Sequence, residues 1–202
     1  GKAMINSVNG KADNMDAIFP LVKKYGGVVV ALTLDEGGIP DTAEGRVAIA
    51  EKILARAAEY GIDKKDIVFD TLAMAISAEP AAAGVTLASL DRIRHELGCH
   101  TSLGVSNVSF GLPARDAVNA TFFALALERG LSAAIMNPYS VDMMKTYSAF
   151  RALRGVDPNC ADYVAASSGF ATVSATATTA APAAQTADEY ASALQKAIVK
   201  GM

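Results

Sequence analysis

The fold is decided by residues 28–70, which read VVVALTLDEGGIPDTAEGRVAIAEKILARAAEYGIDKKDIVFD. This stretch opens and closes with short apolar runs, 28–34 and 67–69, which have the length and composition of buried strands. Between them, residues 43–60 gather apolar side chains on one side and interleave charged ones, namely Val47, Ile49, Ile53, Leu54 and Ala57 against Glu44, Arg46, Glu51, Lys52 and Glu59. The spacing predicts a surface helix that ends at Gly61, so the stretch is one strand-helix-strand unit.

The same alternation extends in both directions along the chain. Further strand candidates lie at residues 3–5, 103–110 and 133–136, and stretches with helical spacing separate them. Neighbouring parallel strands need a long connection, which a helix supplies. The order therefore predicts an α/β fold built on a parallel sheet.

Two parallel architectures fit this order, a doubly wound sheet and a closed (β/α)8 barrel. A doubly wound sheet usually carries a glycine-rich phosphate loop after its first strand, and this chain has no such motif. Barrel enzymes instead place polar residues at the carboxyl ends of many strands, as here at Asn6 and Ser7, Asp35 and Glu36, Asp70, Ser106 to Ser109, and Asn137. We therefore expect a TIM-type barrel.

The chain is short for a whole barrel. A complete barrel typically needs ~250 residues, and about five strand-helix units can be counted in residues 1–164. We expect a partial barrel, and the start at Gly1 directly before the first strand indicates a fragment. Residues 165–187 are rich in Ala and Thr and are predicted to be a linker, and residues 188–202 are predicted to begin a helical module.

The bulk composition argues against several classes of function. The net charge of −3 and the lack of a basic run make nucleic acid an unexpected partner. No apolar stretch approaches the ~20 residues that a membrane helix needs, so we expect a cytoplasmic protein. Cys99, Cys160, His95 and His100 lack partners at metal-ligand spacing, and no metal site is predicted.

The most informative stretch for chemistry is LGVSNVSFGLP at residues 103–113, followed by Arg115. It offers several amide and hydroxyl groups at the end of a predicted strand, and its glycines let a ligand approach the backbone closely. Such a surface suits a flat heteroaromatic ring. On spacing alone, a Ser/Asn turn that only caps the next helix is an equal alternative.

Five motifs occur in a fixed order: INSVN at 5–9, LDEGGIP at 34–40, DIVFD at 66–70, SNVSFGLP at 106–113 and IMNP at 135–138. Together they resemble the pterin-binding domain of corrinoid-dependent methyltransferases, the methyltetrahydrofolate module of methionine synthase and its relatives. The resemblance covers roughly residues 1–163. It implies a barrel of the dihydropteroate-synthase-like kind.

The resemblance also assigns residues to the pterin site. It implies substrate contacts from Asn6, Asp70, Gly104, Ser106 and Arg115. A pterin presents N–H donors along one edge, and a carboxylate such as that of Asp70 can accept two of them in parallel. For Asp70, a helix cap or an ion pair stays open, and the Asn6 amide could equally serve a neighbouring backbone group.

Asn107 is the predicted catalytic residue. The N5-methyl group of methyltetrahydrofolate is a poor electrophile, because its displacement expels an amide-like anion unless N5 gains a proton or a strong hydrogen bond. A donor that strengthens as charge develops is typically worth ~3–4 kcal/mol. The resemblance implies that the acceptor is a cob(I)amide on a corrinoid-binding partner module, and residues 194–202 resemble the opening helix of that module.

Asp35, Ser109 and Asn137 are weaker site candidates, since an acidic pair before Gly-Gly and an Asn before Pro also favour turns. The family normally brings another pterin-binding aspartate from a strand that precedes residues 5–7. We therefore expect complementary strands or self-association to complete the barrel. A dihydropteroate-synthase-like enzyme and a non-catalytic pterin-binding fragment stay open as alternatives, and the final methyl acceptor is not specified by the sequence.

Overall fold

The strands pair in parallel in the order in which they occur along the chain. The computed structural model describes residues 1–170, and its sheet consists of β1 (Met4–Asn9), β2 (Val28–Leu32), β3 (Ile67–Asp70), β4 (His100–Gly104) and β5 (Ala133–Ile135). A doubly wound sheet would reverse its strand order at a switch point. The sequential order is instead that of a partial α/β barrel, as predicted.

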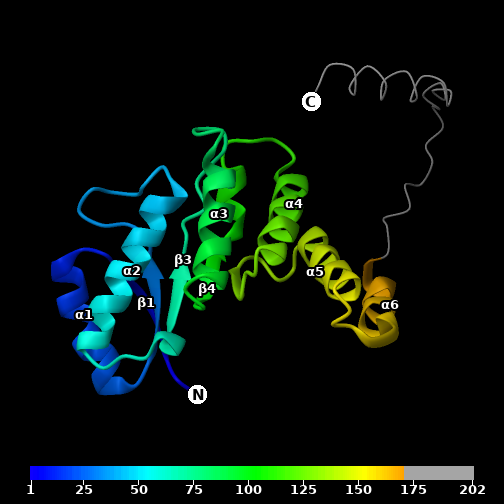
Figure 1. Cartoon of the computed structure of the whole chain (residues 1–202). Helices are drawn as coiled ribbons and strands as arrows, with labels where there is room; N and C mark the ends of the chain where they lie inside the picture. Colours follow the sequence, from blue (N-terminus) through cyan, green and yellow to red (C-terminus); the bar gives the residue numbers. More distant parts are fainter. Residues whose placement is uncertain (171–202) are drawn as a thin grey trace, which may run out of the picture. The chain divides into compact units, whose positions relative to one another are not determined.

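Helices alternate with the strands and pack against their neighbours in chain order. They are α1 (Ala12–Tyr25), α2 (Ala43–Glu59), α3 (Ala82–His95), α4 (Arg115–Glu128), α5 (Val141–Leu153) and α6 (Ala161–Ser167). Figure 1 shows α1 and α2 on one side of the strands, with α3 and then α4 following around them. These helices form part of the outer ring that surrounds the strands of a barrel.

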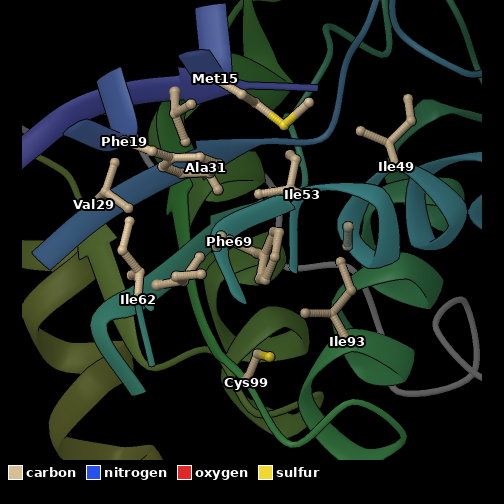
Figure 2. Close-up of a cluster of buried hydrophobic side chains, with 14 of the residues drawn as sticks. Met15, Phe19, Val29, Ala31, Ile49, Ile53, Ile62, Phe69, Ile93 and Cys99 are labelled. Carbon is tan, nitrogen blue, oxygen red and sulfur yellow. The ribbon is translucent and has the colours of Figure 1, made fainter. Parts of the chain in front are cut away.

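A first apolar cluster joins the sheet to α1 and α2. Alternate residues of β2 and β3 point toward these helices, because successive side chains of a strand face opposite sides. Figure 2 shows Ala31 and Phe69 meeting Phe19 of α1 and Ile53 of α2, and all four are fully buried. Helix α2 begins at the N-cap Thr42, whose hydroxyl accepts the N–H of Gly45.

A second cluster covers the later strands. Leu103 of β4 packs with Leu90 of α3 and with Phe122 and Phe123 of α4. Val105, directly after β4, is fully buried in the same cluster. The carboxyl end of β4 is therefore anchored from the helix side, while its other face is left for polar groups.

The predicted strand at 103–110 is wrong in its placement. β4 begins at His100 and ends at Gly104, and Val105–Ser109 form a 3-10 helix. Thr101 and Ser102 are polar, so this part of β4 has no apolar run from which a strand would be predicted. Both residues are nevertheless buried, and the Thr101 hydroxyl donates to the Gly130 carbonyl at 3.1 Å. A satisfied hydroxyl is compatible with a sheet interior, whereas apolar patterning alone misses it.

Other boundaries differ by a few residues. β1 extends to Asn9, so Asn6 lies within the strand, and β2 ends at Leu32. The compact unit runs to Phe170, so residues 165–170, which were predicted to start the linker, lie in α6 and a following 3-10 turn. The rest of the predicted linker and the predicted module at 188–202 lie outside the described residues. Within residues 1–170, no helix is both long and apolar enough to span a bilayer.

Candidate functional site

The carboxyl ends of the parallel strands lie along one edge of the sheet. Register pairs Leu32 with Asp70 and Asp70 with Ser102, which puts the end of β3 at the centre of this edge. Asp70 and Gly104 each follow a residue that packs against the helices, Phe69 and Leu103. Because side chains alternate along a strand, Asp70 and position 104 face the opposite side, which is the interior of the barrel.

Asp70 is a buried carboxylate with only part of its hydrogen-bonding capacity used. It is 9% exposed, and its Oδ1 accepts the N–H of Leu72 at 2.8 Å. Burial raises its pKa, and the Leu72 bond and the charge of Arg46 act against that rise. Within residues 1–170, no cation lies at ion-pair distance from this carboxylate, so Asp70 forms no ion pair there. Asp70 also does not cap the next helix, because α3 begins only at Ala82. The carboxylate can therefore accept further bonds from a ligand.

Gly104 and Asn107 form a second element of the edge. Asn107 is exposed on the 3-10 helix, and its side-chain nitrogen would lie 2.9 Å from a Cβ atom at position 104. The missing side chain of Gly104 thus makes room for the Asn107 carboxamide over the strand end. The carboxamide makes no hydrogen bond within the described part of the chain, so its N–H groups are free to donate.

Arg115, at the start of α4, holds the turn that carries Asn107. Its Nε donates to Ser109 Oγ at 2.8 Å, and its Nη2 donates to the Ser106 carbonyl at 2.8 Å. The guanidinium also lies over the Phe110 ring, 4.5 Å from the centroid. Ser109 is fully buried, and its hydroxyl donates to Ser106 O. In this arrangement Arg115 and Ser109 shape the turn, and the Ser106 side chain makes no hydrogen bond among the described residues.

Asn6 shares the barrel face with Asp70 but lies deeper in the sheet. It follows Ile5, which packs against the helix-side cluster, so Asn6 faces the barrel interior and is exposed there. Its register partner is Val30, which pairs with Val68 two residues before Asp70. At ~3.3 Å per residue, Asn6 lies about 7 Å below the level of Asp70.

Asp35 and Glu36 are engaged in a turn that fastens α1. Asp35 Oδ1 accepts the Gly37 N–H at 2.9 Å, and Glu36 Oε1 accepts the Ala12 N–H at the start of α1 at 2.8 Å. The Ala12 N–H, then the backbone N–H of Glu36 itself, and then Lys52 lower the pKa of Glu36 to about 2. The hydrogen bonds of both carboxylates thus agree with the turn alternative.

Asn137, like Asp35, forms hydrogen bonds that close a turn. Its Oδ1 accepts the Tyr139 N–H at 3.0 Å, and its carbonyl accepts the Ser140 N–H at 3.1 Å. These bonds close the turn that leads into α5, as the Asn-Pro sequence indicates. Within residues 1–170, no three or more His, Cys, Asp and Glu side chains are grouped so as to hold a metal ion.

The sequence interpretation missed Arg46. It was assigned to the charged, solvent-facing side of α2, and this is wrong, because Arg46 is only 2% exposed. The available signal was its spacing: positions 46, 50, 53 and 57 follow the helical repeat, and all four are buried. Its guanidinium reaches the backbone directly after Asp70.

A comparison with protein families gives a match over most of the described chain. The sequence profile of the family described as pterin binding enzyme matches residues 1–137. The chain belongs to the pterin-binding enzyme family. The Asp70 and Gly104–Asn107 elements both lie inside the matched region.

Similar sequences within this family are methyltransferases. The chain is 35% identical over 163 residues to the methylcorrinoid:tetrahydrofolate methyltransferase of Eubacterium limosum, covering 79% of this chain and 60% of that protein. It is 36% identical over 152 residues to the methionine synthase of Mycobacterium tuberculosis, covering 68% of this chain and 13% of that protein. The chain thus spans less than two thirds of the length of each of these relatives.

A solved structure confirms the fold. The dihydropteroate synthase of Yersinia pestis superposes with a TM-score of 0.62 over 77% of this chain and 65% of that one. The two sequences are only 15% identical, so this likeness establishes the barrel architecture and not the reaction.

Proposed function

We propose that this chain binds methyltetrahydrofolate and takes part in transfer of its N5-methyl group to the cob(I)amide of a corrinoid module, as in methionine synthesis or related one-carbon pathways. The observation that carries the proposal is the pairing of two groups at one edge of the sheet. A buried carboxylate with free acceptor capacity, Asp70, stands one strand away from a free amide donor, Asn107, above the bare backbone of Gly104. The names of the similar methyltransferases support the same reaction class.

In this proposal Asp70 orients the pterin. The amino-pyrimidinone edge of the ring carries neighbouring N–H donors, and the buried carboxylate accepts them. Low solvent exposure strengthens these bonds, because water does not compete for the carboxylate. Asn6, which faces the same side of the sheet, supplies an amide deeper in the site.

Asn107 acts at the reacting nitrogen. Its amide N–H donates to N5, and this bond strengthens as the methyl group leaves and electron density builds on N5. An amide does not give up its proton, so the proton that N5 finally gains comes from solvent. The corrinoid supplies the nucleophile when its module is docked, and the exposed position of Asn107 leaves room for a second module to approach.

A dihydropteroate-synthase-like reaction is the alternative enzyme. That reaction handles a phosphate-containing leaving group, for which arginine, lysine or histidine at a late strand would be suitable. The turn after β5 instead carries Asn137, Pro138, Tyr139 and Ser140. The stronger sequence likeness to methyltransferases also favours methyl transfer.

A methyl-transfer assay with free cob(I)alamin tests the proposal. Titration calorimetry with methyltetrahydrofolate should show binding, and the spectrum of cob(I)alamin should change to that of methylcobalamin when chain and substrate are added. Binding without transfer would favour a non-catalytic pterin-binding module. Transfer of the pterin to an aromatic amine in place of methyl transfer would favour the synthase reaction.

Completion of the barrel is part of the proposal. The two outer strands of the sheet, β1 and β5, expose Met4 by 60% and Ile135 by 53%. Unpaired strand edges and exposed apolar residues favour association. We expect either the missing barrel strands or self-association to cover these edges. Light scattering on the purified 202-residue chain, with mass spectrometry to detect any other polypeptide, tests this expectation, and a stable monomer would contradict it.

A further inference from the structure

The turn after Asp70 has an uncommon backbone conformation. Leu72 has a φ of 60°, in the left-handed region that favours glycine. A non-glycine residue holds such a conformation only where its surroundings fix it. The Leu72 N–H donates to Asp70 Oδ1 at 2.8 Å, so the same turn also holds one oxygen of the carboxylate.

Arg46 supplies much of that fixation. Its Nη1 lies 2.5 Å from the Thr71 carbonyl and 3.0 Å from the Leu72 carbonyl, and its Nε donates to the Pro40 carbonyl at 2.9 Å. Thr86 of α3 completes the cluster, with its hydroxyl 3.2 Å from Arg46 Nη1 and 3.1 Å from Leu72 O. One buried side chain of α2 therefore ties together the loop before it, the turn after β3 and α3.

The chemistry of this cluster is unusual for a purely structural arginine. The guanidinium is almost completely buried, and within residues 1–170 it forms no ion pair at contact distance. Burial lowers its pKa, and the acidic groups Glu79, Asp41 and Asp70 act in the opposite direction. Such a charge is costly to bury, which makes its location beside the site carboxylate informative.

We propose that Arg46 is a positioning residue for Asp70, holding the Thr71–Leu72 turn so that one carboxylate oxygen is fixed and the other is presented to the ligand. This inference rests on the proposed function for the identity of the ligand. Arg46 itself does not touch the pterin. It acts through two backbone carbonyls, and its charge opposes the rise that burial causes in the pKa of Asp70.

The test uses the full 202-residue chain and two readouts. The first is amide hydrogen exchange at Leu72, which needs no ligand. The second is calorimetric affinity for methyltetrahydrofolate in a double-mutant cycle of Arg46→Lys with Asp70→Ala. Arg56→Lys is the matched control, since Arg56 lies on the same helix but its ion pair with Asp16 is exposed.

Arg46→Lys should speed exchange at Leu72 and weaken binding on the order of tenfold, and Arg56→Lys should do neither. In the Asp70→Ala background, Arg46→Lys should cause no further loss of affinity. An unchanged Leu72 exchange rate, or a full additional loss in that background, would overturn the inference. If Arg46→Lys does not fold, Thr86→Val decides by the same two readouts, because it removes the hydroxyl that meets both Arg46 and Leu72.

Failure of the proposed function gives a different pattern. In that case the unaltered chain does not bind methyltetrahydrofolate, or Asp70→Ala leaves its affinity unchanged. Loss of Leu72 protection in Arg46→Lys would then still establish that Arg46 positions the turn, while the ligand would have to be another one.

Discussion

Two neighbouring strand ends of the site are each held by an arginine, but in different ways. At the end of β3, the arginine is buried and the functional carboxylate of Asp70 is buried with it. At the end of β4, Arg115 is only partly buried, it lies over the exposed Phe110 ring, and the functional amide of Asn107 is exposed. A desolvated, fixed carboxylate suits recognition of a flat ligand edge. An exposed amide on a braced turn suits a position where charge develops and a second module approaches.

The largest effect should come from the β4 end. Asn107→Ala should lower the turnover rate by roughly 100- to 1,000-fold, because it removes a donor whose bond strengthens in the transition state. Affinity for methyltetrahydrofolate should change far less. Single-turnover kinetics with cob(I)alamin and calorimetry measure the two quantities.

Asn107→Asp is the matched variant, since it keeps the shape of the side chain and removes its N–H donors. It should be as slow as Asn107→Ala. A weakened affinity with an unchanged rate in either variant would make Asn107 a binding residue and would erase the functional difference between the two strand ends.

A change at the end of β3 should affect mainly the affinity for methyltetrahydrofolate, whereas a change at the end of β4 should affect mainly the turnover rate. Asp70→Ala should weaken methyltetrahydrofolate binding by ~1–3 kcal/mol, because ligand donors lose their partner in a buried site. Asp66→Ala provides the control: Asp66 lies just before the other end of β3 and pairs with Lys2. Equal affinity of the Asp70→Ala protein and the unaltered chain in calorimetry would remove Asp70 from the site.

A smaller effect should follow from filling the space above β4. Gly104→Ala puts a Cβ atom 2.9 Å from the Asn107 side-chain nitrogen, so the carboxamide must move. We expect a loss of turnover of about tenfold with little loss of affinity, since a small misplacement of a catalytic group costs rate. Gly84→Ala on α3 is the control, because a Cβ atom there meets nothing within 4 Å. Equal rates for the two alanine variants would show that the Asn107 position is not fixed by Gly104.

The sequence predicted most of the strand-helix order, because apolar periodicity reports directly on which face is buried. It predicted β2, α2 and β3 closely, since that stretch has clear patterning and a clear helix end. It misplaced β4 because Thr101 and Ser102 are polar yet satisfied in the sheet. It could name Asp70 and Asn107 through the family motifs, and their placement at neighbouring strand ends follows from the fold.

The contacts of Arg46 could not be predicted from the sequence. A charged residue on a helix is normally solvated, and the partners that make its burial tolerable are carbonyls of Pro40, Thr71 and Leu72. Backbone carbonyls leave no pattern in a sequence. Only the folded chain brings them to one point, so the positioning role could not be read from residue types.

The smallest expected effect concerns stability, and it separates the two strand ends without any ligand. The raised pKa of Asp70 comes first from burial, so the folded state disfavours its ionised form. The sign follows by linkage: this group favours folding below its unfolded pKa of 3.8, and that contribution is lost as pH rises through the higher folded pKa.

Asp70→Asn has no such titration and can still accept the Leu72 N–H. The variant should therefore be more stable than the unaltered chain at pH 7, on the order of 1 kcal/mol as at other functional sites, and the gap should narrow toward pH 3. Asn107→Ala, at the exposed β4 end, should show no pH-dependent gap. Thermal unfolding at several pH values measures these stability differences. An Asp70→Asn protein that is less stable than the unaltered chain at pH 7 would mean that hydrogen bonds and nearby charge stabilise the ionised carboxylate more than burial destabilises it.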